Sequence, residues 1–172
     1  MLGGRPGAFE RLVREYQGLC WHVVQRMVRH PEDTRELCQE AFLRVHRKLH
    51  QYRFDAPLKA WIGQVAYTVA LRHLERRRIP LDDGEGVVEQ VAGDDDVVAA
   101  AEHEDLARAL HEAIDTLPPL QRTLLTLYHL DELPIGEIAT ITGLAENTIK
   151  SHLFRSRKRL RALLEPRIGV AA

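Results

Sequence analysis

An acidic segment divides this chain into two parts and limits what each part can fold into. Between residues 80 and 105 there are ten Asp or Glu side chains and no Lys or Arg, whereas the residues on either side are net basic. A segment so charged, with Pro and Gly among its residues, cannot bury enough apolar surface to form a core. We therefore expect a first domain at 1–79, a flexible acidic linker at 80–104, a second domain at 105–166 and a tail at 167–172.

Apolar side chains repeat at helical spacing in both flanking parts, and no alternating strand pattern of useful length interrupts them. The first part shows three such stretches, over residues 9–27, 31–49 and 57–78. The second part shows four, beginning shortly after residue 105. The chain is thus predicted to be all-α, with two small helical domains that need no disulfide to fold.

A short helix, a Gly-centred turn and a longer helix are predicted near the end of the second part. Pro134 suits the first turn of the short helix, and Gly143 permits the tight turn that follows it. The longer helix carries an apolar stripe, and residues 147–161 hold six Lys or Arg and no acid. A helix with an apolar back and a cationic front fits the major groove of DNA, although a basic helix can also be a solvated surface. The pattern favours a helix-turn-helix that binds DNA.

Cysteine usage and hydropathy favour a cytoplasmic location. Cys20 and Cys38 fall at apolar helical positions, which favours buried free thiols in a reducing environment over a disulfide framework. The N-terminus lacks the apolar core of a signal peptide, and the longest apolar run has five residues, too few to span a membrane. We expect a soluble cytoplasmic protein without membrane insertion.

Several motifs occur in an order that is specific when they are taken together. Residues 33–45 read DTRELCQEAFLRV and resemble the DAEDLVQExFLRV segment of sigma region 2, and residues 61–66 read WIGQVA and resemble its WLxxIA helix. Residues 117–122 (LPPLQR), 137–139 (EIA) and 147–157 (NTIKSHLFRSR) resemble sigma region 4. With this order and spacing, nearly the whole chain is similar to the extracytoplasmic-function (ECF, group 4) sigma factors of the sigma-70 family.

This resemblance implies a sigma factor, which directs core RNA polymerase to a specific set of promoters in transcription initiation and is not itself an enzyme. Region 2 would dock on the clamp helices of the β′ subunit and melt the −10 element. Region 4 would bind the −35 element and the flap of the β subunit. The resemblance also implies regulation by an anti-sigma factor that responds to stress or envelope signals and can hold the chain at the membrane. We expect no cofactor, and no metal because the His and Cys side chains lack paired C-x2-C spacing.

The resemblance and the predicted helix faces together give three sets of candidate site residues. For the −35 element they are Lys150, Ser151, Phe154, Arg155, Arg157 and Lys158. For the −10 element, where the 53–59 loop would hold a flipped base, they are Arg53, Phe54, Lys59, Trp61, Gln64, Thr68, Arg72 and Arg76. For docking on core polymerase they are Asp33, Glu36, Gln39, Glu40 and Leu43.

The sequence departs from the family pattern at three places. Ala145 stands where a capping Ser or Thr is usual before the recognition helix. Thr68 stands where Asn is frequent, and Arg72 stands where Asp is frequent. Because the last two lie where relatives contact the −10 element, the −10 preference of relatives is not carried over.

Two other classes of function are left open by the residues. An autonomous regulator with a LuxR-like helix-turn-helix would need a sensor or dimerisation domain, and residues 1–79 show no phosphoacceptor α/β pattern. A metal- or thiol-based enzyme or sensor could use a set of Cys and His side chains without paired C-x2-C spacing. These are Cys20, His22, Cys38, His46 and His50.

Overall fold

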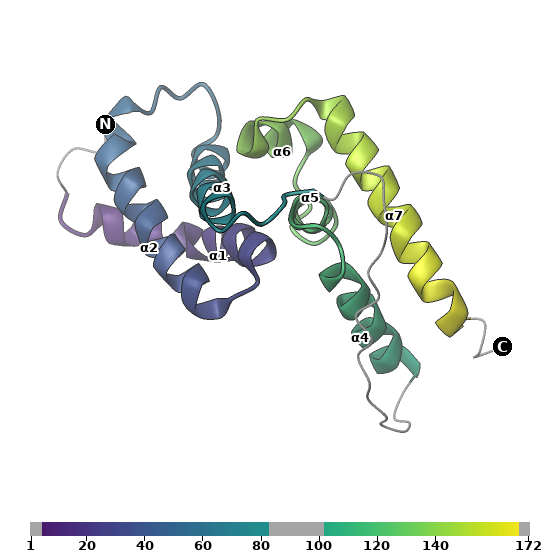
Figure 1. The fold of residues 1–172 in the computed structure, drawn as a ribbon. Helices are drawn as coiled ribbons and strands as arrows, with labels where there is room; N and C mark the ends of the chain where they lie inside the picture. The colour runs from purple at the N-terminus through teal and green to yellow at the C-terminus, as the bar shows by residue number, and fades with distance from the viewer. Residues whose placement is uncertain (1–4, 83–101, 169–172) are drawn as a thin grey trace.

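The computed structural model describes residues 5–82 and 102–168, and the regular structure in these ranges is entirely helical. The first range holds α1 (Ala8–Val28), α2 (Pro31–Lys48), the short 3-10 helix η1 (Leu49–Gln51) and α3 (Leu58–Arg76). The second holds α4 (Glu102–Asp115), α5 (Pro119–His129), α6 (Ile135–Thr142) and α7 (Glu146–Ile168). Figure 1 shows the two groups of helices side by side. The all-α prediction is confirmed, and most of the predicted linker, residues 83–101, lies outside the described residues.

A two-residue connection joins α1 to α2. Arg29 ends α1 in the left-handed conformation (φ 57°), and its N–H donates to the Gln25 carbonyl at 2.8 Å. His30 then caps α2, because its ring Nδ1 accepts from the Asp33 N–H at 3.3 Å, and Pro31 occupies the first helical turn. The connection makes α1 and α2 a hairpin, and both helices pack against α3.

The predicted helix-turn-helix is formed by α6 and α7. Gly143 ends α6 with a φ of 74°, and its N–H donates to the Ala139 carbonyl at 2.8 Å. Ala145 offers no side-chain acceptor to the start of α7. Its carbonyl accepts from the Ile149 N–H at 3.1 Å, so the first turn of α7 closes with backbone hydrogen bonds.

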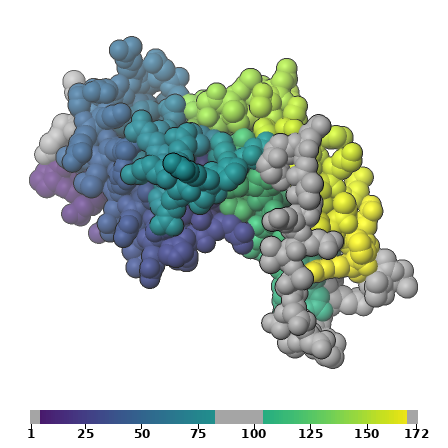
Figure 2. Space-filling model, viewed as in Figure 1, coloured from purple at the N-terminus to yellow at the C-terminus, as the bar shows by residue number. Residues whose placement is uncertain are grey.

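The two groups of helices share one hydrophobic core. The larger cluster of buried side chains joins residues of α1, α2 and α3 to residues of α5, α6 and α7, because α1 packs on α5 and α3 packs on α6. A Cβ atom at Gly63 in α3 would lie 2.9 Å from Cγ1 of Ile141 in α6, so glycine permits this close approach. Figure 2 shows the teal and green surfaces of the two groups in contact.

A buried arginine strengthens the contact between the groups. Arg122 in α5 is 3% exposed, and its guanidinium donates to the carbonyls of Arg26 and Met27, the latter at 3.3 Å. It also donates to the Leu117 carbonyl within its own group at 2.9 Å. Burial, together with the neighbouring Arg29 guanidinium, lowers the pKa of Arg122 to about 10. The charge is therefore compensated by backbone dipoles that come from both groups.

Exposed and half-buried ion pairs add to the same boundary. His22 Nδ1 in α1 lies 3.4 Å from Asp131 Oδ1, in the segment between α5 and α6. Arg29 Nη2 lies 3.6 Å from Asp115 Oδ2 at the end of α4. Pairs this exposed stabilise by less than about 1 kcal/mol each. The shared core and Arg122 therefore hold the two groups together.

Candidate nucleic-acid interface

The first half of α7 has one buried side and one exposed side. Ile149, Leu153 and Ser156 are buried against the rest of the second group. The predicted −35 residues other than Arg155 are exposed: Lys150, Ser151, Phe154, Arg157 and Lys158. Phe154 is 66% exposed, which is unusual for an aromatic side chain unless it serves a contact. This face offers cationic, hydroxyl and aromatic groups to a ligand in front of the helix.

Arg155 lies differently from the other predicted −35 residues, because it is half-buried beside His152. Its Nη2 lies 3.2 Å from His152 Nδ1, and among the described residues its buried Nε has no hydrogen-bond partner. Burial lowers the pKa of His152, and the Arg155 charge acts in the same direction, whereas Asp82 raises it. A neutral His152 can accept from Arg155, so this arginine is held toward the helix surface.

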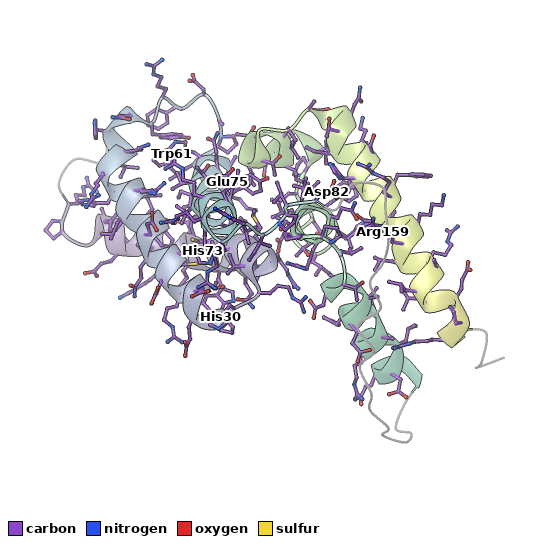
Figure 3. All side chains as sticks on the ribbon, viewed as in Figure 1. His30, Trp61, His73, Glu75, Asp82 and Arg159 are labelled. Carbon is purple, nitrogen blue, oxygen red and sulfur yellow. The ribbon has the colours of Figure 1, made fainter. Side chains whose placement is uncertain are left out.

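The start of the acidic segment touches the same helix. Asp82 Oδ2 lies 3.7 Å from His152 Nδ1 in α7, and Asp82 Oδ1 lies 3.5 Å from Gln121 Nε2 in α5. The Leu120 N–H also donates to the Leu81 carbonyl at 3.0 Å. Figure 3 labels Asp82 at this boundary. Residues 81 and 82 therefore lie against the second group of helices although they follow α3 in the chain.

An aromatic cluster joins the loop before α3 to the first turn of α3. The ring of Tyr52 lies 4.6 Å from that of Phe54 and 5.4 Å from that of Trp61, centroid to centroid, and the Tyr52 hydroxyl donates to the Ala56 carbonyl. Phe54 is 72% exposed and has a φ of 61°, a strained conformation for this residue type. The sequence predicted Phe54 and Trp61 as −10 residues but not Tyr52. The only sequence signal for Tyr52 is its position two residues before Phe54 in the same loop.

Cationic and polar side chains extend this cluster along α3. Arg53 and Lys59 are exposed beside the aromatic rings. Farther along the helix Gln64, Arg72 and Arg76 are exposed, and Thr68 is half-buried with its hydroxyl donating to the Gln64 carbonyl at 2.8 Å. The predicted −10 residues therefore lie in the loop before α3 and along α3, where all except Trp61 and Thr68 are exposed. Such a surface of rings and cations suits the bases and phosphates of a single strand.

The predicted docking residues on α2 do not form a single surface. Asp33 faces α3, where its Oδ2 lies 3.6 Å from His73 Nε2 and 3.5 Å from Arg77 Nη2 (His73 is labelled in Figure 3). Glu36 is exposed. Glu40 forms a salt bridge with Arg44 one turn later in α2. Asp33 therefore supports the packing of α2 on α3 rather than the exposed face of α2.

The remaining two docking residues line an apolar groove between α1 and α2. Gln39 and Leu43 form part of its wall, and Leu43 is 58% exposed. The groove has a volume of about 700 Å³. Its other lining residues come from both helices and are Phe9, Val13, Gln17, Gly18, Trp21, Arg35, Cys38 and Phe42. Sequence reasoning predicted a polar docking face here and missed this groove, because its α1 wall reads as ordinary core.

The described residues contain no group of three or more His, Cys, Asp or Glu side chains placed to hold a metal ion. The ring of His46 packs edge-on against Phe9 at 4.8 Å between centroids. Within residues 5–82 and 102–168, no helix is long and apolar enough to cross a membrane.

Comparison with known proteins identifies the class to which this helical, DNA-binding architecture belongs. Residues 12–79 match the family Sigma-70 region 2, and residues 107–160 match the family Sigma-70, region 4. The two matches cover most of α1, all of α2 and α3, and most of the second group of helices. The chain therefore belongs to the sigma-70 family of RNA polymerase sigma factors. It is a transcription initiation factor that directs RNA polymerase to promoters.

Its relatives include sigma factors of the ECF group. The RNA polymerase sigma-H factor of Pseudomonas aeruginosa is 27% identical over 95% of this chain and 89% of the relative. The ECF RNA polymerase sigma-E factor of Escherichia coli K12 is 29% identical over 96% and 91%. The ECF sigma factor SigM of Mycobacterium tuberculosis is 28% identical over 95% and 80%.

Solved structures share the fold. The sigma factor RpoE in complex with the anti-sigma factor NepR, from Bartonella quintana, has a TM-score of 0.65 and 22% identity, and covers 92% of this chain and 98% of that one. CnrH in complex with the cytosolic domain of CnrY has a TM-score of 0.66 and 20% identity, over 95% and 91%. At these identities the likeness supports the architecture of the helices.

Proposed function

We propose that the exposed face of α7 reads the −35 element in the major groove. Lys150, Ser151 and Phe154 would contact base edges and thymine methyl groups, because they lie on the part of α7 that follows the turn. Arg157 and Lys158, farther along the helix, would contact phosphates. Arg155 would join the base contacts after its Nη2 leaves His152, since an extended side chain is needed to reach guanine.

The aromatic loop before α3 would bind the melted −10 strand. Exposed rings stabilise unstacked bases by about 1–3 kcal/mol each, and the neighbouring arginines and lysine attract the phosphates. Phe54 is already held outward by its strained backbone, so it needs no rearrangement to stack on a base. Tyr52 and Trp61 support it from behind.

The apolar groove between α1 and α2 would dock core polymerase at the clamp helices of β′. Leu43 and Gln39 supply its rim, and the exposed Glu36 supplies an acid beside it. An amphipathic helix can place its apolar side in such a groove and its charges against the rim. Glu40, paired with Arg44, would contribute less because that salt bridge must open. Region 4 would bind the β flap, and an anti-sigma factor would compete for these surfaces in the cytoplasm, as supported by the anti-sigma complexes of structural neighbours.

The two promoter surfaces would separate before initiation. The −10 and −35 elements lie about 25 base pairs apart, or about 85 Å at 3.4 Å per base pair. A compact chain of this length has a radius of gyration of about 16 Å. Residues held by the shared core cannot span that distance. The contact of α3 with α6 would therefore open on polymerase, and the packed arrangement would be that of the free protein.

One observation supports the proposal best: α7 of the second group exposes a cationic face, and the loop before α3 in the first group exposes an aromatic ring. Reconstituted transcription with core polymerase on a genomic promoter library tests it, with transcript starts mapped by sequencing. We expect starts at a small set of promoters that share −35 and −10 elements. Promoter-specific binding by the chain without polymerase, and no starts with it, would favour an autonomous regulator.

A further inference from the structure

Two thiols lie at the apolar groove, and the functions proposed above assign no chemistry to them. Cys20 in α1 is fully buried, whereas Cys38 in α2 is half-buried and lines the groove. Cys20 precedes the Arg29–His30 connection by about 13 Å of helix, and Cys38 follows it by about 12 Å, at 1.5 Å per residue. In a helical hairpin, residues at equal distances from the connection lie at the same level of the two helices. The hairpin thus places one hidden and one accessible thiol at the same level.

The two thiols are close enough to influence each other's ionisation. Interaction with the Cys20 thiol is the main cause that lowers the pKa of Cys38, and the same interaction, together with burial, raises the pKa of Cys20. Cys38 is therefore the better nucleophile of the pair, because the thiolate is the reactive form of a cysteine. The buried Cys20 stays protonated until its neighbour reacts.

We propose that Cys38 is an oxidation site for organic hydroperoxides that enter by the groove, with Cys20 as the partner that closes a disulfide between α1 and α2. The rings and aliphatic side chains of the groove suit an alkyl or aryl group, and its volume of about 700 Å³ lies within the range of small-molecule sites. The polar O–O bond of the hydroperoxide would lie at the half-buried Cys38.

The hydroperoxide is the oxidant of the overall reaction. The Cys38 thiolate attacks the outer oxygen, so an S–O bond forms, the O–O bond breaks and an alcohol leaves after taking a proton. This gives the sulfenic acid of Cys38. The Cys20 sulfur then attacks the Cys38 sulfur, and hydroxide leaves with the Cys20 proton as water. One hydroperoxide is reduced to an alcohol, and two thiols are oxidised to one disulfide.

Mass spectrometry of the full chain after exposure to cumene hydroperoxide tests the assignment of the two thiols. We expect the wild type to lose two hydrogen masses and to give a peptide that joins α1 to α2. Cys20→Ser should stop at a sulfenic acid that dimedone traps on Cys38, and Cys38→Ser should give no adduct and no disulfide. Over-oxidation of Cys38 in the wild type without a disulfide, or equal reactivity of Cys20 in Cys38→Ser, would overturn the proposal.

Entry by the groove has its own test at Gly18. This exposed residue of α1 lines the groove, and a Cβ atom there would meet nothing within 4 Å, so Gly18→Leu adds bulk to the groove without a clash. We expect it to slow oxidation by cumene hydroperoxide much more than oxidation by hydrogen peroxide. Gly136→Leu, in α6 and away from the groove, is the matched control and should change neither rate. Equal slowing of both oxidants by Gly18→Leu would overturn entry by the groove.

Oxidation would also alter the surface proposed for polymerase docking, because Gln39 and Leu43 line the same groove. This consequence rests on the proposed function, whereas the thiol chemistry does not. We expect the disulfide form to lose affinity for core polymerase and to regain it with reductant, while Cys20→Ser/Cys38→Ser ignores the oxidant. Equal binding by the oxidised and reduced forms would overturn the consequence. Failure of the reduced protein to bind polymerase would instead overturn the proposed function.

Discussion

Replacing Arg122 with methionine tests whether the two groups of helices are one folding unit. The guanidinium donates to the Arg26 and Met27 carbonyls across the boundary, and the site is almost fully buried. Methionine fills a similar volume but leaves both of these carbonyls, and the Leu117 carbonyl, without their donor. Each loss across the boundary costs about 1–3 kcal/mol, so we expect Arg122→Met to lower the free energy of unfolding by at least about 2 kcal/mol.

The assay is thermal and urea unfolding, followed by circular dichroism and calorimetry. We expect a single transition in the wild type, and in Arg122→Met a lower midpoint, by roughly 4 °C or more, with separation into two transitions. Arg167→Met is the matched control, because Arg167 pairs with Glu112 in an exposed contact at 3.1 Å worth less than about 1 kcal/mol. Equal effects of the two substitutions would refute the argument that Arg122 joins the groups.

Three further predictions concern the proposed surfaces. Phe54→Ala should weaken open-complex binding on duplex promoters by about 1–3 kcal/mol. If lost stacking is the cause, a template with a preformed bubble should show the same defect. Normal open-complex formation on both templates would refute the stacking role. Lys158→Ala should weaken promoter binding uniformly across sequences and reduce the slope of log K against log salt by about 0.9, whereas a loss confined to one −35 sequence would indicate base reading. Leu43→Asp should abolish binding to core polymerase. Leu130→Asp is the control and should leave binding intact, because the Leu130 side chain is also 58% exposed but does not line the groove. Equal binding by the two variants would contradict docking at the groove.

The helices of the fold were predictable because Pro and Gly residues mark helix ends at the same places where the apolar periodicity starts or stops. Pro31 begins α2 and Gly143 ends α6 as the sequence indicates. The exposed face of α7 also follows from helical spacing, since Ile149 and Leu153 fix which side is buried. Periodicity and turn chemistry act over a few residues, so they can be seen without the partner helices.

The contact between the two groups was not predictable in the same way. Ile141 reads as core of its own helix, and Gly63 reads as an ordinary residue of a motif. Only their close approach shows that α3 and α6 pack together. The same limit applies to Asp33 and Arg155, which helical spacing places on outer faces. Asp33 turns toward His73, which comes from α3 and cannot be placed from the pattern of α2. Arg155 turns toward His152, a neighbour three residues earlier on α7, and helical spacing alone does not show that it folds back onto this ring instead of extending.

A disulfide between positions 63 and 141 tests the central claim, that the packed chain must open to direct polymerase to promoters. Cγ1 of Ile141 lies 2.9 Å from a Cβ at Gly63, close to the about 3.0 Å that separates a Cβ from the far sulfur of a disulfide. Gly63→Cys with Ile141→Cys, in a Cys20→Ser/Cys38→Ser background, therefore provides a lock. Promoter-dependent transcription with core polymerase is measured before and after reduction. We predict no initiation by the oxidised protein and full recovery with reductant, whereas equal initiation by the oxidised and reduced forms would contradict the claim.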